Sequence, residues 1–177
     1  MNRPQFIRRT ALAVAISVAA PLAYAQAQVK LTLGHGAAPG NPRHEASLKF
    51  AEVAKAKSNG RIEVQVSPSA QLGDDAAMVT ALRTGALDLS ANSQGAIAGV
   101  VPEYAAFGMP FLCADLQHAW KVMDGPLGKE LAAKSADKGM VVLGYWDNGI
   151  RHMTNSKRAL VRPEDLKGLK MRTPPDA

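Results

Sequence analysis

Cysteine is almost absent from this sequence, which excludes one common way of stabilising an exported protein. The 177 residues contain a single cysteine, Cys113, in the stretch "GMPFLCADL". One thiol cannot form an internal disulfide, so the fold must be stabilised by packing. Because Cys113 lies among apolar residues, we predict that it is a small residue of the core.

A hydrophobic run long enough to span a membrane is also missing. The apolar run at residues 11–20 is too short to cross a bilayer, which argues against the alternative of a membrane anchor. It follows three arginines and precedes a small-x-small site at residues 23–25, the layout of a secretory signal peptide. We therefore predict a cleaved signal peptide over residues 1–25 and Sec-type export. No cysteine near the cleavage site could carry a lipid, so we expect a free, soluble mature protein.

Removal of that segment leaves 152 residues, enough for one well-packed domain, and lowers the formal net charge from +6 to +3. No run of lysines and arginines with interleaved aromatics is present, so we expect no nucleic acid partner.

Motifs of catalysis and of metal or cofactor binding are missing as well. The four histidines have no metal-ligand spacing, and there is no Gly-x-Ser-x-Gly elbow. The stretch "GHGAAPG" has the wrong glycine spacing for a nucleotide fingerprint. Cys113 and His118 are five residues apart, but packing explains them better than catalysis does. We expect neither an enzyme, a metal nor a cofactor.

Hydrophobic periodicity predicts alternating strands and helices. Patterns with a period of two, or continuous apolar runs, predict strands within 29–35, 61–69, 86–93 and 140–146, with β-like segments at 150–156 and 169–173. Helical spacing with caps and closing glycines predicts helices within 41–60, 73–87, 115–125 and 125–139. This alternation indicates an α/β fold with a largely parallel sheet.

Ligands of open α/β sheets bind beyond the carboxyl ends of the strands. The segments that follow the predicted strands carry few carboxylates but include Arg151 and Arg172. Guanidinium groups hold carboxylates through paired hydrogen bonds, so these arginines suit an anion. The alternative is that both are surface charges or pair with Asp147, Glu164 or Asp165, since such exposed pairs are common.

Five ordered blocks resemble one known family. They are "HEASLKFAEVAKAKSNGRIEVQVSPSAQLGDD", "ALRTGALDLSANS", "FGMPFL", "NGIRHMTNSKR" and "EDLKGLKMRTP". With these blocks in this order, the chain from Val29 to Asp176 resembles the DctP-type solute receptors of tripartite ATP-independent periplasmic (TRAP) transporters.

The resemblance implies a periplasmic binding protein-like α/β fold with two lobes that close about a hinge. The implied ligand is an organic acid, either a monocarboxylate, keto acid or dicarboxylate. The implied partners are the small and large membrane subunits of a TRAP permease, to which a periplasmic, monomeric receptor delivers the acid.

The resemblance also implies site residues. Arg172 matches the arginine that grips the ligand carboxylate, and Arg151 matches a second arginine of the cleft. Asn148, from the same block as Arg151, is a weaker candidate, and Asn92 and Ser93 match first-lobe contacts.

Receptors of this family are about twice as long, so we expect lobe one over 26–147 and an incomplete start of lobe two over 148–177. We therefore expect "IRHMTNS" and "LKMRT" to pair weakly or lie exposed. Three alternatives remain: the binding protein of an ATP-driven importer, a small exported hydrolase or lyase, and a truncated, non-functional receptor fragment.

Overall fold

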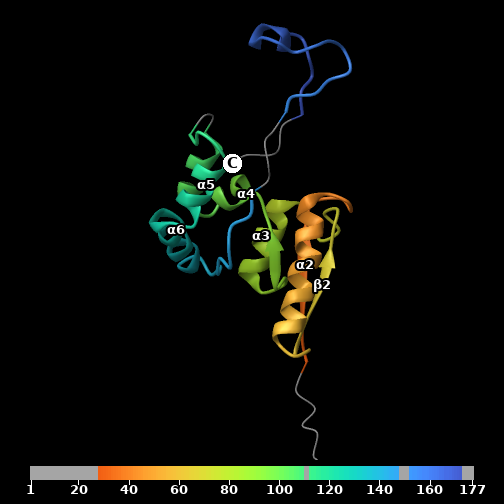
Figure 1. Cartoon of the computed structure of the whole chain (residues 1–177), viewed down its shortest axis with the longest axis vertical. Helices are drawn as coiled ribbons and strands as arrows, with labels where there is room; N and C mark the ends of the chain where they lie inside the picture. Colours follow the sequence, from red (N-terminus) through yellow and green to blue (C-terminus); the bar gives the residue numbers. More distant parts are fainter. Residues whose placement is uncertain (1–27, 110–111, 148–151, 173–177) are drawn as a thin grey trace, which may run out of the picture.

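The computed structural model describes residues 28–109, 112–147 and 152–172. Figure 1 shows an α/β part built around strands and helices α2 and α3, with helices α4, α5 and α6 beside it. The segment 152–172 lies at the other end of the molecule from the start of β1.

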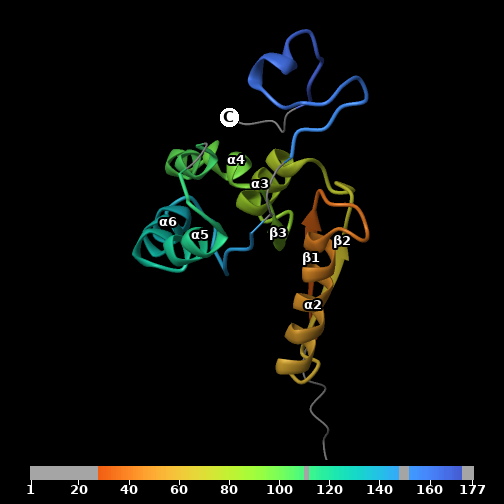
Figure 2. The ribbon, with the colours of Figure 1, turned by 45° about the horizontal axis from the view of Figure 1, so that its top comes forward.

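The sheet has three parallel strands in the order β2-β1-β3. The strands are β1 (Val29–His35), β2 (Ile62–Ser67) and β3 (Leu89–Ala91). Along β1, Val29 pairs with Ile62 of β2, and His35 pairs with Ala91 of β3. Figure 2 shows β1 between its two neighbours, with α2 running beside β1 and β2. Burial increases along β1 from exposed Val29 to buried His35, so this central strand is best packed at its carboxyl end.

The first two helices begin at their predicted caps, and α3 also ends at its predicted glycine, whereas α2 ends at Lys57, earlier than its closing glycine Gly60 predicts. Helix α2 (Pro42–Lys57) follows Asn41, whose side chain accepts a hydrogen bond from the Arg43 N–H. Helix α3 (Asp75–Thr84) follows Asp74, which caps the Ala77 N–H, and ends at Gly85 with a φ of 74°. Glycine adopts this left-handed conformation without steric cost, which explains the sharp stop of α3.

Four further helices of the described residues follow β3 and lie beside the α/β part. They are α4 (Gln94–Ala98), the 3₁₀ helix η1 (Pro102–Gly108), α5 (Leu116–Met123) and α6 (Pro126–Ala136). They bury one apolar cluster together with α3, and its members are Val79, Ala98, Val101, Tyr104, Leu131 and Met140. No helix among the described residues is both long and apolar enough to cross a membrane.

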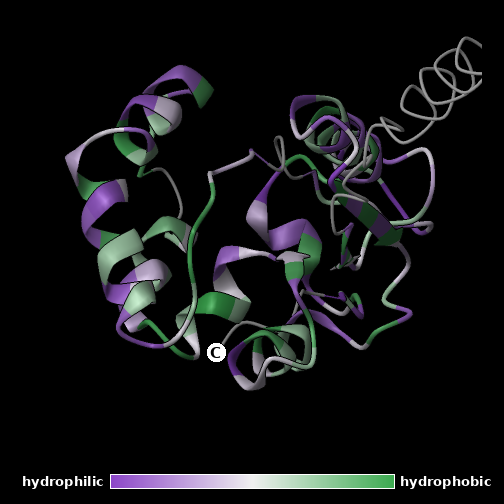
Figure 3. Cartoon of the chain, turned by 90° about the horizontal axis from the view of Figure 1, so that it is seen from below, coloured by the Kyte–Doolittle hydropathy of each residue, from purple (hydrophilic) through white to green (hydrophobic). Residues whose placement is uncertain are grey.

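Two expectations about the core are wrong. Residues 140–147 form no strand, and Val141 and Leu143 are 80% and 69% exposed. A continuous apolar run becomes a buried strand only where neighbouring strands and helices cover it, and the described sheet ends at β3. Hydrophobic stretches, green in Figure 3, accordingly occur on irregular segments as well as on helices. Cys113 is half-buried in an irregular segment and is not part of the apolar cluster.

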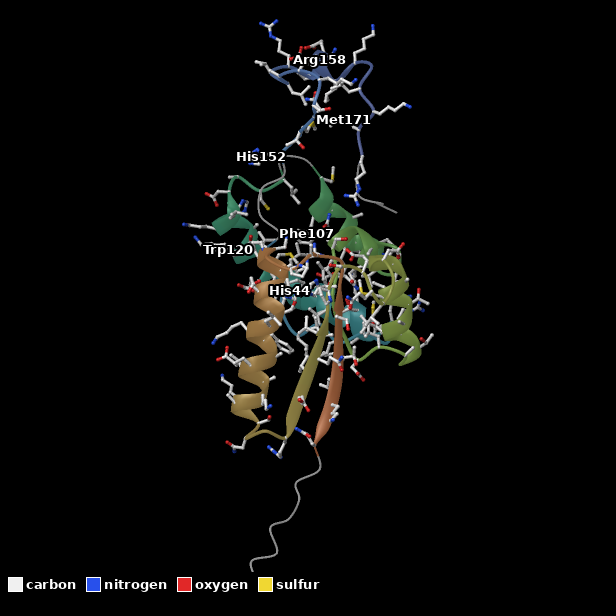
Figure 4. The ribbon with its side chains drawn as sticks, turned by 90° about the vertical axis from the view of Figure 1, so that its right-hand side faces the viewer. His44, Phe107, Trp120, His152, Arg158 and Met171 are labelled. Atoms are coloured by element: carbon white, nitrogen blue, oxygen red, sulfur yellow. The ribbon has the colours of Figure 1, made fainter. Side chains whose placement is uncertain are left out.

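The segment 152–172 is held mainly by its own turns. Its one regular element among the described residues is the 3₁₀ helix η2 (Pro163–Leu166). Arg158 donates hydrogen bonds to the carbonyls of Asp165 and Lys167, and the Asp165 carboxylate accepts from the Val161 and Arg162 N–H groups. Those two N–H groups lower the pKa of Asp165. Figure 4 shows Arg158 and Met171 well away from the α/β part.

The described residues of "IRHMTNS" and "LKMRT" form no strand and are mostly exposed, as expected.

Candidate functional site

The candidate site lies at the carboxyl edge of the parallel sheet, where β1 and β3 end side by side. Asn92 and Ser93 follow β3 directly and are both half-buried. The Ser90 hydroxyl donates to the Gly34 carbonyl and to the Asn92 side-chain oxygen, at 3.0 and 2.7 Å. A hydroxyl has one hydrogen, so the Gly34 carbonyl and the Asn92 side-chain oxygen share the Ser90 donor. The contact with Ser90 holds the Asn92 side chain against the end of the sheet.

The nitrogen of the Asn92 amide has an unusual environment. This Nδ2 atom is buried and has no hydrogen-bond partner among the described residues. An unpaired buried polar group costs about 1–3 kcal/mol, so native structures seldom keep one without a reason. The two N–H groups of Asn92 are therefore unused donors at this edge among the described residues.

A half-buried ion pair supports the loop that carries Asn92 and Ser93. The Asp75 carboxylate, at the start of α3, accepts the Ser93 N–H at 3.0 Å and lies 4.0 Å from an Arg43 guanidinium nitrogen. The same guanidinium nitrogen donates to the Ala91 carbonyl at 3.5 Å. One acid and one base thus connect the starts of α2 and α3 to the end of β3.

Sequence reasoning missed both Arg43 and Asp75, although each left a signal. The two aspartates at the start of α3 exceed what one cap requires, so the second was available for another role. Arg43 lies in the first turn of α2, where the helix dipole disfavours a cation. An arginine in that position is explained by an acidic partner from elsewhere in the chain.

Two buried histidines form the layer beneath this edge. His35 ends β1 and His44 lies in the first turn of α2, and their ring nitrogens Nε2 and Nδ1 are 3.2 Å apart. The Ala37 N–H donates to the other nitrogen of His35. Burial, then the neighbouring His44 and Arg43, lower the pKa of His35, and the Asp75 carboxylate opposes them. Figure 4 shows His44 at the junction of α2 with the rest of the fold.

The arginines expected to bind the ligand are not placed in this cluster. Arg172 is exposed and makes no hydrogen bond or ion pair with any described residue, including Glu164 and Asp165. Arg151 and Asn148 lie outside the described residues. Of the five predicted site residues, the structure therefore places the sequence neighbours Asn92 and Ser93 at this edge, and it does not place the five as one set.

Two shallow hollows in the described part of the chain lie elsewhere. One is lined by residues 30–32 of β1 and 63–65 of β2. The other lies between α6, the end of α5 and residues 142–145. Neither includes a predicted site residue. No three histidine, cysteine or acidic residues of the described ranges are grouped so that they could hold a metal ion.

Comparison with known proteins identifies the family. The model of the bacterial extracellular solute-binding proteins, family 7 (DctP), matches residues 33–177. The chain is 54% identical over 152 residues to the uncharacterised protein y4mM of Sinorhizobium fredii, covering 86% of this chain and 28% of that protein. The match spans 28–52% of the length of each of eight curated relatives, which is about half of that length or less.

Solved structures agree. The fold is similar to that of the sugar acid binding protein DctPAm from Advenella mimigardefordensis in complex with galactonate. The TM-score is 0.77 at 34% identity, covering 80% of this chain and 46% of that one. It is also similar to a TRAP periplasmic solute binding protein from Sulfurospirillum deleyianum with bound succinate, with a TM-score of 0.74 at 34% identity over 80% and 46% of the two chains. The chain belongs to family 7 of the bacterial extracellular solute-binding proteins, the DctP family of TRAP receptors, and matches the N-terminal part of its longer members.

Proposed function

We propose that this chain provides the first lobe, and the beginning of the second, of a periplasmic receptor that binds an organic acid by its carboxylate. The observation that carries the proposal is the buried, unpartnered amide nitrogen of Asn92 at the carboxyl edge of the sheet. Two similar proteins of known structure hold galactonate and succinate, which are acids rich in acceptor oxygens. An acceptor oxygen of such an acid would satisfy the Asn92 amide.

The carboxylate itself is assigned to the arginines. Arg172 and Arg151 would grip it through paired charge-assisted hydrogen bonds, with Asn148 as a further polar contact. Asn92 and Ser93 would contact the ligand from lobe one. Closure of the lobes about a hinge would then exclude water and strengthen these bonds.

The receptor would work in transport and not in catalysis. After removal of residues 1–25 it would act in the periplasm as a monomer and deliver the acid to the small and large membrane subunits of a TRAP permease. Lobe one would comprise residues 26–147, and residues 148–177 would begin lobe two.

The test is a substitution of Arg172 in the protein made from the full coding sequence that contains these residues. Isothermal titration with succinate and with galactonate would compare Arg172→Ala with Lys170→Ala, which removes an exposed positive charge two positions away. We expect binding to weaken by at least about tenfold to a hundredfold for Arg172→Ala, since the loss of even one charge-assisted bond costs roughly 1.5–3 kcal/mol.

Lys170→Ala should change the affinity by less than about threefold, because an exposed charge contributes little. Equal affinities for the wild-type protein and Arg172→Ala would contradict the assigned role. Failure of the wild-type protein to bind any organic acid would contradict the proposed function.

A further inference from the structure

The two adjacent aspartates at the start of α3 have different roles. Asp74 is exposed, and its carboxylate caps α3 through the Ala77 N–H at 2.8 Å. Asp75 is the first residue of the helix, and its carboxylate leaves the helix to accept the Ser93 N–H, 18 residues later in the chain. The helix gains its cap from Asp74, so the hydrogen bond of Asp75 serves another part of the fold.

Three connections meet at the Asp75 carboxylate. The loop after β3 reaches it through Ser93, and α2 reaches it through Arg43. The loop after β1 approaches it closely, because a Cβ at Gly36 would be 3.2 Å from Asp75 Oδ1. Asp75 is thus surrounded by the segments that form the carboxyl edge of the sheet, where ligands of such folds bind.

This arrangement is more sheltered from water than an ordinary surface pair. The side chains of Arg43 and Asp75 are 20% and 21% exposed, whereas those of the pair Lys49–Glu52 on α2 are 67% and 68% exposed. Ion pairs sheltered from water are less screened, and removal of one partner leaves the other charge poorly solvated. Ser93 has no side-chain capping bond to α4, so its backbone bond to Asp75 is a main restraint on the entry to that helix.

We propose that Asp75, held by Arg43, is a positioning residue of the candidate site. It fixes the loop after β3 so that Asn92 and Ser93 face the ligand, and it does so without touching the ligand. This inference rests on the proposed function, because the loop needs to be ordered only if Asn92 and Ser93 bind a ligand.

The experiment compares Asp75→Ala, Asp75→Asn and Asp74→Ala in the protein made from the full coding sequence. Each variant removes one negative charge at the start of α3. Asp75→Asn retains an oxygen that can accept the Ser93 N–H, and it serves as the second variant if Asp75→Ala does not fold. Amide hydrogen exchange of Ser93 and the side-chain ¹⁵N resonance of Asn92 are measured without ligand, and succinate and galactonate affinities by calorimetry.

We expect Asp75→Ala to accelerate Ser93 exchange and to weaken acid binding, each about tenfold or more, as for loss of a bond to a charged group. Asp75→Asn should restore most of the Ser93 protection and part of the affinity. Asp74→Ala should lower the melting temperature but leave Ser93 exchange and acid affinity within about twofold, since its capping bond lies within α3.

Unchanged Ser93 exchange in both Asp75 variants would overturn the proposal, and so would an Asp74→Ala variant that loses affinity as much as Asp75→Ala. If the wild-type protein bound no acid, the proposed function would fail, and the Ser93 and Asn92 measurements would then decide whether Asp75 orders the loop. Binding by the wild-type protein with unaltered affinity in Asp75→Ala would keep the proposed function and reject the positioning role.

Discussion

The pair of buried histidines allows a prediction about acid stability. The Ala37 N–H donates to His35 Nδ1, so that nitrogen carries no proton in the folded state. The hydrogen of the neutral ring is then on Nε2 and points to His44 Nδ1, 3.2 Å away. A second proton on His35 would have to sit on Nδ1, where it would face the Ala37 N–H. Protonation of His35 therefore breaks a hydrogen bond in a buried position.

The direction of the effect follows from the pKa of His35, which lies below its ordinary value of 6.5 because of burial, His44 and Arg43. The unfolded chain then takes up a proton at a higher pH than the folded chain. Stability contributed by neutral His35 is fully present above about pH 6.5 and is lost as the pH falls toward the lowered pKa. If folded His35 takes no proton, linkage gives a loss of at most about 1.4 kcal/mol between pH 7.5 and 5.5.

Carboxylates contribute little in this interval. Glu103 and Asp165 also have lowered pKa values, but their ordinary values are 4.5 and 3.8, so their contribution to stability is lost at lower pH. Urea unfolding followed by circular dichroism at pH 7.5, 6.5 and 5.5 measures the change. The variant His35→Gln keeps a donor and an acceptor but does not titrate, so it should be less dependent on pH. The exposed His152→Gln should behave like the wild-type protein.

Two results would refute this reasoning. One is a wild-type free energy of unfolding that stays constant from pH 7.5 to 5.5. The other is a decrease of the same size in His35→Gln, which would place the titrating group elsewhere. Nitrogen chemical shifts of the imidazole rings provide an independent check, because they must report the Nε2–H tautomer of His35 at neutral pH.

Two further predictions concern packing and are measured by urea unfolding at neutral pH. Gly128→Ala should destabilise the protein by about 3 kcal/mol or more, because the new Cβ would overlap with the Met123 carbonyl oxygen. Gly144→Ala, where no described atom lies within 4 Å of the new Cβ, should be nearly neutral, and equal costs would contradict this packing. Leu131→Ala should cost about 2–5 kcal/mol, because Leu131 is 2% exposed in the apolar cluster, and a loss below about 1 kcal/mol would show that α6 does not pack there.

Features that depend on a few neighbouring residues were predictable from the sequence. Strand β1 occupies the predicted residues 29–35. Helix α2 begins at Pro42 after its Asn41 cap, and α3 ends at Gly85. Capping and left-handed glycine conformations are decided within one turn of the chain, so the local sequence is sufficient to place them.

Features that depend on distant partners were less predictable. Residues 140–146 have the composition of a buried strand, yet they are largely exposed because no described strand pairs with them. On α2, His44 and Ser47 are the buried residues. The helical spacing of apolar residues pointed instead to Ala46, Phe50, Val53 and Ala54. Burial is decided by what packs against a residue, and a period in the sequence does not identify that partner.

The candidate site combines both kinds of information. The family resemblance pointed to Asn92 and Ser93, but nothing adjacent to them in the sequence explains why their loop is ordered. The explanation is the Asp75 carboxylate, which depends in turn on an arginine at an unfavourable end of α2. The electrostatic cost of Arg43 at that position is offset only when α2, α3 and β3 assemble. Order in the loop that holds Asn92 is therefore a property of the assembled edge of the sheet. A substitution at Arg43 or Asp75 should disorder this loop under conditions in which the rest of the fold is still stable.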